Sequence, residues 1–186
     1  QPDGRVRFLG HPVKGAATTK KILKRLRSSS KAIECVSLMV DQHLRPSQLA
    51  QKGELPTSRA VYRYYRDLDD VAVDTLYLCM ADYLAARGPS IDLGDWDRHC
   101  GRMRFTLQEK RIQETPERRQ RLLTGHDLMT FFNLPPGPNL KPILEMVQEN
   151  QAAGEVRTKE EALTMVSHAL GKEPVTSSMQ RGGQDV

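Results

Sequence analysis

The stretch LTGHDLMTFFNLPPGPNLKPILEMVQENQAAGEVRTKEEALTMV, residues 123–166, decides the fold that this sequence predicts. Apolar residues recur in it every three or four positions, a spacing typical of helices with one buried face. The runs cover residues 127–132, 140–153 and 158–171. The segment NLPPGPN separates the first two runs, and Gly154 ends the second. Thr158 and Glu161 have the spacing of a capping box, which predicts the start of the third helix.

The residues before this stretch also have helical spacing. The expected helices cover residues 13–27, 30–45, 58–68, 71–87 and 96–114. Ser29 or Ser30 is a candidate N-cap for the second of these helices, and Thr57 or Ser58 for the third. No run alternates with the period of two residues that a half-buried strand requires, so the predicted fold class is all-α.

Turn-forming residues mark a boundary inside the chain. The sequence GPSIDLGD, which starts at Gly88, is the best candidate for it. The final EPVTSSMQRGGQDV has almost nothing to bury and is expected to be disordered. The expected organisation is a helical domain over 1–90, a linking charged helix over 91–121, a tail unit over 122–172 and a disordered tail over 173–186.

The composition favours a globular protein with an anionic partner. Hydrophobic residues make up 38% of the 186, which is enough for a modest core, and the formal net charge is +5. Such an excess of positive charge suits nucleic acid as a partner. The alternative is a basic surface that is merely solvated.

The sequence contains neither a membrane span nor a secretion signal. No apolar run approaches the ~20 residues that a span requires. Cys35, Cys79 and Cys100 are odd in number and lack metal-type spacing, so we expect reduced thiols. We therefore expect a cytoplasmic protein. Because the sequence starts at Gln1 in what reads as the middle of a loop, we also expect a piece of a larger chain.

The stretch over 123–166 resembles the carboxy-terminal segment of the bacterial tRNA nucleotidyltransferases, the family of CCA-adding enzymes and poly(A) polymerases. The shared pattern is a Gly-x-Asp-Leu step, a Pro-Gly-Pro turn, a helix, a Gly-Glu-hydrophobic turn and a Thr-x-Glu-Glu-Ala helix. The positions that match it in order are Gly125, Asp127, Leu128, Pro136, Gly137, Pro138, Gly154, Glu155, Thr158, Glu160, Glu161 and Ala162.

A second stretch resembles the later part of the HD-type helical domain found in many of these enzymes. It is FLGHPVKGAATTKKILKRLRSSSKAIECVSLMVDQHLRP, with LYLCMADYLAARG behind it. His11, His43 and Asp82 match metal-ligand positions of the HD pattern, but its adjacent His-Asp pair is absent. The resemblance therefore implies a multi-helical HD-like bundle followed by a smaller helical tail unit, with a vestigial metal site that lacks the donors an ion needs.

The family's catalytic groups are also absent from this sequence. Its Gly-Ser pair and two catalytic carboxylates belong to a head domain that would precede Gln1. The resemblance implies that this head uses magnesium to add nucleotides from CTP or ATP to tRNA, while this region holds the RNA. We thus expect no catalytic residue or cofactor in this chain. The implied partners are tRNA or another RNA and the amino-terminal head of the same parent chain, and no membrane.

Two basic runs are candidates for RNA contact, because Lys and Arg bind backbone phosphates without reading sequence. The residues are Lys20, Lys21, Lys24, Arg25, Arg27, Arg118, Arg119 and Arg121. The alternative is that both runs are solvated helix faces. Among the aromatic residues only Tyr64 is considered for base stacking, since Tyr62 and Tyr65 have the spacing of core residues.

The Pro-Gly-Pro turn is another candidate for phosphate binding. A helix follows it, and the first amide groups of a helix lack intrahelical partners and attract anions. Gly137 would permit close approach, and Lys141 could add a charge. The alternative is a plain turn between two helices. Asp127 is expected to cap the short helix that begins at Leu128. The motif positions with expected structural roles are Gly125, Asp127, Pro136, Pro138 and Gly154.

The leading hypothesis is therefore the RNA-holding body and tail of a CCA-adding or poly(A)-adding nucleotidyltransferase, inactive without its head. A rival from another class is an HD-type metal-dependent phosphohydrolase, which His11, His43 and Asp82 would favour. A third reading is a protein-interaction module built on the amphipathic helices near the carboxy terminus.

Overall fold

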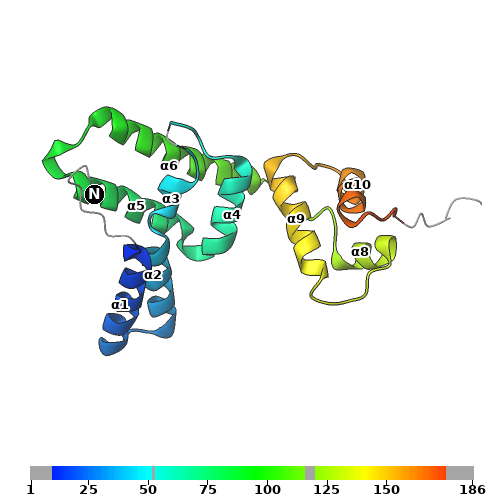
Figure 1. Ribbon diagram of the computed structural model, residues 1–186, viewed down its shortest axis with the longest axis horizontal. Helices are drawn as coiled ribbons and strands as arrows, with labels where there is room; N and C mark the ends of the chain where they lie inside the picture. The colour runs from blue at the N-terminus through cyan, green and yellow to red at the C-terminus, as the bar shows by residue number, and fades with distance from the viewer. Residues whose placement is uncertain (1–9, 52, 116–119, 175–186) are drawn as a thin grey trace, which may run out of the picture. The chain divides into compact units, whose positions relative to one another are not determined.

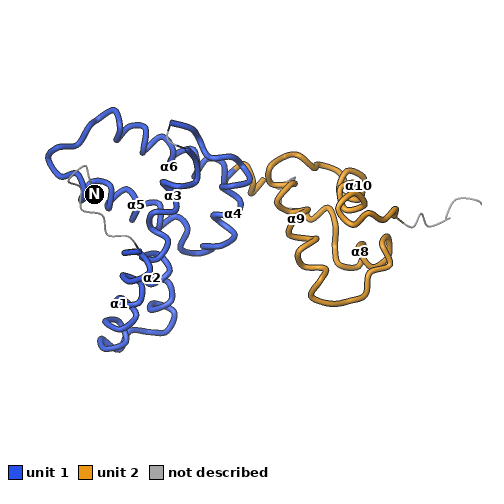
Figure 2. Tube along the Cα trace, in the orientation of Figure 1, with its two compact units in different colours: residues 1–111 blue, residues 112–186 orange. Residues whose placement is uncertain are grey.

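The computed structural model describes residues 10–51, 53–115 and 120–174, and every regular element in these ranges is a helix (Figure 1). This result confirms the predicted all-α fold class. The chain divides into two compact units, Gln1–Arg111 (unit 1) and Ile112–Val186 (unit 2) (Figure 2). Most of the tail expected to be disordered, residues 175–186, lies outside the described residues.

Unit 1 holds the longer series of helices. Its elements are α1 (His11–Arg25), α2 (Ser30–Gln42), α3 (Arg45–Gln48), α4 (Ser58–Leu68), the 3-10 turn η1 (Asp69–Val71), α5 (Ala72–Arg87), the 3-10 turn η2 (Gly88–Ser90) and α6 (Leu93–Gln113). The hydroxyl oxygens of Ser29 and Thr57 accept backbone N–H groups at the starts of α2 and α4, so these two residues are the N-caps. The second helix, expected to reach residue 45, ends at Gln42. Pro46 lies in the first turn of α3, where its missing N–H is tolerated.

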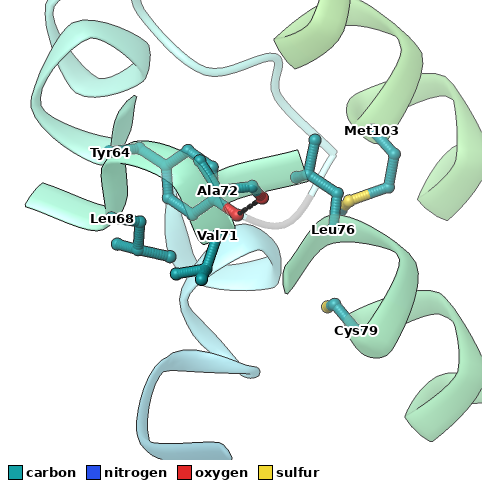
Figure 3. Close-up of a cluster of buried hydrophobic side chains, with 7 residues drawn as sticks. All are labelled: Tyr64, Leu68, Val71, Ala72, Leu76, Cys79 and Met103. Carbon is teal, nitrogen blue, oxygen red and sulfur yellow. Dashed lines mark hydrogen bonds between the residues drawn. The ribbon is translucent and has the colours of Figure 1, made fainter. Parts of the chain in front are cut away.

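The core of unit 1 forms where α4, η1, α5 and α6 meet. Its members are Tyr64, Leu68, Val71, Ala72, Leu76, Cys79 and Met103 (Figure 3). Tyr64 is completely buried, and its hydroxyl donates to the Ala72 carbonyl oxygen at 2.6 Å. The prediction that Tyr64 is the tyrosine available for stacking is wrong. The buried face of α4 runs through Val61, Tyr64 and Leu68, because the Ala72 carbonyl satisfies the hydroxyl inside the core.

Helices α1 and α2 lie side by side as a hairpin (Figure 1). Ala16 and Ser37 are their only buried residues. A Cβ atom on Gly15 would lie 3.1 Å from a methyl carbon of Val40, so the glycine lets the two helices approach closely. The predicted apolar face of the first helix is largely uncovered, with Val13 67% and Leu26 65% exposed. The hairpin therefore displays most of its side chains.

Unit 2 contains α8 (Gly125–Phe132), α9 (Leu140–Ala153) and α10 (Lys159–Leu170). These helices confirm the predicted runs, and Gly154 ends α9 in the left-handed conformation, with φ 77°. The capping box of Thr158 and Glu161 is present at the start of α10. The buried cluster that joins the helices consists of Leu123, Leu128, Phe132, Val147, Val156, Ala162 and Val166.

Candidate nucleic-acid interface

The basic residues of α1 and of the turn after it lie in a stretch of sequence without acidic residues. The five cations predicted from the sequence, Lys20, Lys21, Lys24, Arg25 and Arg27, are all exposed. No Asp or Glu occurs between Gly10 and Ile33, and none of the five cations forms an ion pair with a residue that the structure describes. Unneutralised charges of one sign reinforce each other's potential, so this surface attracts anions. We call these five residues the α1 basic patch.

Part of the α1 basic patch also has a structural reason to be basic. Lys24 and Arg25 lie in the last turn of α1, where cations interact favourably with the negative end of the helix dipole. Such an effect is worth ~0.3–1 kcal/mol for an exposed side chain. It does not account for Lys20 and Lys21, which lie before the last turn.

The second predicted basic run is only partly described. Arg121 is exposed, whereas Arg118 and Arg119 lie outside the described residues. The structure therefore gives a position for Arg121 alone, a few residues before α8.

The start of α9 does not offer the free amides on which the predicted phosphate site depends. The N–H groups of Leu140 and Lys141 donate to the carbonyl oxygens of Gly137 and Pro138, each at 3.2 Å. The next residue, Pro142, has no N–H group. The Lys141 ammonium lies 3.8 Å from a carboxylate oxygen of Glu145. The first two amide groups of α9 are therefore already hydrogen-bonded within the turn, and the third residue has no amide hydrogen to donate to a phosphate.

Asp127 serves the start of α8, but not as its N-cap. The N-cap is Thr124, and Asp127 sits at the third helical position, where it completes a capping box. Its carboxylate accepts the backbone N–H of Thr124 at 2.7 Å and the ammonium of Lys159 at 2.5 Å. Partial burial alone would raise the pKa of this carboxyl, but the hydrogen bonds from Lys159 and Thr124 outweigh burial and lower the pKa to about 2.

Two of the three HD-type positions lie together. Nε2 of His11 is 3.3 Å from Nε2 of His43, and Nδ1 of His43 is 2.7 Å from the Val40 carbonyl oxygen. Because Nδ1 donates to that carbonyl, a neutral His43 accepts at Nε2, and His11 donates to it. Asp82 is exposed. The described residues contain no group of three or more His, Cys, Asp or Glu side chains that could hold a metal ion, so they do not fit a metal-dependent hydrolase centre.

The structure also assembles an aromatic group that the sequence analysis missed. Tyr83 of α5 stacks on His99 of α6 with ring centroids 4.4 Å apart, and Trp96 lies 5.6 Å from Tyr83. The guanidinium carbon of Arg87 lies 3.4 Å from the centroid of the Tyr83 ring. The only sequence signal was the spacing of Tyr83 and Arg87, four residues apart on one helix. Which residue of α6 they meet depends on tertiary packing.

Comparisons with known proteins identify the family of this chain. Residues 13–166 match the family model described as tRNA nucleotidyltransferase domain 2. The chain is 32% identical to a CC-adding tRNA nucleotidyltransferase of Thermus thermophilus over 169 residues, which are 90% of this chain and 35% of the relative. It is 31% identical to an A-adding tRNA nucleotidyltransferase of Deinococcus radiodurans over 179 residues, 93% of this chain and 38% of the relative. No solved structure matches significantly.

The fold and the surface define an all-helical region with exposed cations along α1. The chain belongs to the tRNA nucleotidyltransferase family, since the family model covers most of its length. It spans only about a third of the two relatives named above. None of the helices that the structure describes is long and apolar enough to cross a membrane.

Proposed function

We propose that this chain is the RNA-holding region of a tRNA-terminal nucleotidyltransferase and that it grips folded tRNA through phosphate contacts and shape. The observation that carries the proposal is the α1 basic patch, in a member of this family. Lys and Arg contacts to phosphates supply affinity without reading bases. Helix α1 carries no Phe, Tyr or Trp, which suits a reader of RNA shape more than a reader of unstacked bases.

Nucleotide transfer belongs, in this proposal, to an amino-terminal head domain of the same parent protein. There a carboxylate pair would hold magnesium, which would supply charge stabilisation for transfer from CTP or ATP. This chain is similar to a CC-adding and to an A-adding relative at nearly the same identity. That similarity supports a head that selects the nucleotide and a region here that serves either activity. The role also suits the cytoplasm, where tRNA is found.

The experiment compares binding of this chain to folded tRNA and to a single-stranded RNA of equal length across a salt series. We expect tighter binding to tRNA and a logarithmic salt slope of several units, since each phosphate contact contributes ~0.9 of a unit on duplex RNA or DNA. Equal affinity for the two RNAs at every salt concentration contradicts a tRNA grip. Absence of RNA binding at low salt leaves a scaffold for other protein domains as the function.

A matched pair of variants assigns the binding to α1. Lys24→Ala removes an unpaired cation of the α1 basic patch, whereas Arg66→Ala removes a cation whose guanidinium lies 2.8 Å from Asp67. We expect Lys24→Ala to lower the salt slope by ~1 and Arg66→Ala to leave it unchanged, because the Arg66 guanidinium is held by the Asp67 carboxylate, which also pairs with Arg45. The variant that combines Lys20→Ala, Lys21→Ala and Lys24→Ala should lose most of the preference for folded tRNA over single-stranded RNA. Equal slopes for all of these variants would place the contacts away from α1.

A further inference from the structure

A pocket of about 690 Å³ lies in unit 1 among α5, α6 and the loop before α4. Its size falls within the range of ~300–1,000 Å³ that small-ligand sites occupy. Its lining includes four arginines, Arg87, Arg98, Arg102 and Arg104, and the apolar side chains of Leu55 and Phe105. It is distinct from the α1 basic patch, because no residue of α1 lines it.

The arginines of the pocket outnumber its acids. The lining contains Glu54, Asp95 and Asp97 against four guanidinium groups, which leaves one positive charge in excess. Asp95 pairs with Arg98 through a hydrogen bond between their side chains. Arg87 lies over the Tyr83 ring, a position that leaves its charge in place. The pocket therefore favours an anion, and the remaining acids lie where hydroxyl or amino groups of a ligand could donate to them.

Arg102 has a donor that the protein does not use. Its Nε–H group is buried and has no hydrogen-bond partner in the described part of the chain. An unpaired buried donor on a charged group destabilises the folded state. A phosphate oxygen in the pocket would be a suitable acceptor, because guanidinium groups bind phosphate through charge-assisted bonds.

The buried His99 does not neutralise the arginine charges of the pocket. His99 is 1% exposed, and neither of its ring nitrogens has a hydrogen-bond partner among the described residues. Burial first, and then the charges of Arg102 and Arg87, hold the pKa of His99 below its ordinary value. The Cys79 carbonyl opposes this shift, although the two groups do not meet with hydrogen-bond geometry. A neutral His99 carries no charge, so it neither repels nor neutralises the neighbouring arginines, Arg102 and Arg87.

We propose that this pocket binds one nucleotide, with its phosphate against Arg102 and its base against Phe105 and Leu55. The combination of guanidinium groups with an apolar wall suits a phosphate that carries a base better than it suits a bare anion. The nucleotide can belong to an RNA chain or be a free nucleoside triphosphate. In the first case the inference rests on the proposed function and adds a contact point to the tRNA grip.

Trp96 gives a local signal for the test. It is the single tryptophan of the chain, and its ring lies 5.6 Å from that of Tyr83, which lines the pocket. Trp96 fluorescence is therefore titrated with tRNA, with CTP, with ATP and with inorganic phosphate. We expect saturable changes with tRNA or with the triphosphates, and only a weak change with inorganic phosphate, which lacks a base.

Variants then tie the signal to the pocket. Arg102→Gln is expected to weaken binding of the active ligand at least ~5-fold, or to lower a tRNA salt slope by ~1, while Arg66→Ala changes neither. Arg104→Gln is the second variant, because Arg104 is exposed and its loss should leave the fold intact. Circular dichroism checks the fold of each variant.

The outcomes separate this inference from the proposed function. A response to tRNA that Arg102→Gln or Arg104→Gln weakens supports an RNA nucleotide as the occupant. A response to CTP or ATP alone supports a free nucleotide. If tRNA binds the wild-type chain and both arginine variants equally well, and no triphosphate changes the fluorescence, the pocket proposal is overturned while the tRNA grip stands. If tRNA does not bind at all, the grip fails, and the triphosphate arm alone decides the pocket.

Discussion

The Nζ atom of Lys159, in the first turn of α10, lies 2.5 Å from Oδ1 of Asp127, at the third position of α8. The same carboxylate accepts hydrogen bonds from the backbone N–H and the hydroxyl of Thr124. One side chain thus closes the capping box of α8 and connects the starts of two helices of unit 2. The aspartate of the Gly-x-Asp-Leu step therefore has a structural role in this chain.

Replacing this aspartate should destabilise unit 2 in neutral solution. We expect Asp127→Asn to lower the free energy of unfolding by about 1–2 kcal/mol, through loss of the charged capping partner. Circular dichroism in a denaturant series measures both units, whereas Trp96 fluorescence reports unit 1 alone. The loss should therefore appear in the dichroism transition only. A matching shift in Trp96 fluorescence would contradict this assignment.

The same carboxylate predicts a pH dependence. The pKa of Asp127 is lowered from 3.8 to about 2 in the folded chain, so the folded state favours the ionised form. Its stabilisation is complete above pH ~4 and is lost as the pH falls toward 2. We expect wild-type unit 2 to lose more stability than the Asp127→Asn variant across this window. Parallel curves for the two proteins would show that the ion pair with Lys159 does not contribute.

The hydroxyl of Tyr64 should matter to unit 1, because it donates to the buried Ala72 carbonyl oxygen at 2.6 Å. Tyr64→Phe removes this buried hydrogen bond, at a cost of about 0.5–1.5 kcal/mol. Tyr77→Phe is the control, since Tyr77 is 61% exposed. Trp96 fluorescence during denaturation measures both variants. Equal denaturation midpoints for Tyr64→Phe and the wild type would show that this hydrogen bond does not stabilise unit 1.

Two glycines of the family motif should differ in what they do for stability. Gly154 has φ 77°, a conformation that costs an ordinary L residue ~1 kcal/mol or more, so Gly154→Ala should destabilise unit 2 by about that amount. A Cβ atom on Gly137 would meet nothing within 4 Å, so Gly137→Ala should change stability by less than ~0.5 kcal/mol. Dichroism melts compare the two variants.

The α9 turn should contribute little to RNA binding. The amides of Leu140 and Lys141 already donate to carbonyl oxygens of the turn, and Pro142 has none. We expect Gly137→Ala to bind tRNA with the affinity and salt slope of the wild type. A loss of affinity in this stable variant would show that the turn opens to receive a phosphate.

Local sequence determined the helices and their ends. Ser29, Thr57, Gly154 and the Thr158–Glu161 capping box act through atoms only a few residues apart. Such interactions can be predicted from spacing because no distant residue takes part in them. The motif that resembles the family consists of the same helix starts and turns, so the family could also be predicted from the sequence.

Only tertiary structure decided which faces are buried and which groups remain available. Tyr62 and Tyr65, which the spacing predicted as core residues of α4, are only half-buried, and Tyr64 is buried instead. The Ala72 carbonyl, which belongs to another helix, accepts the Tyr64 hydroxyl inside the core. Val13 and Ile22 of α1 remain exposed although α1 packs along α2. The pocket around Arg102 required α5, α6 and a loop to converge. Burial depends on what packs opposite a residue, and this information is not local in the chain.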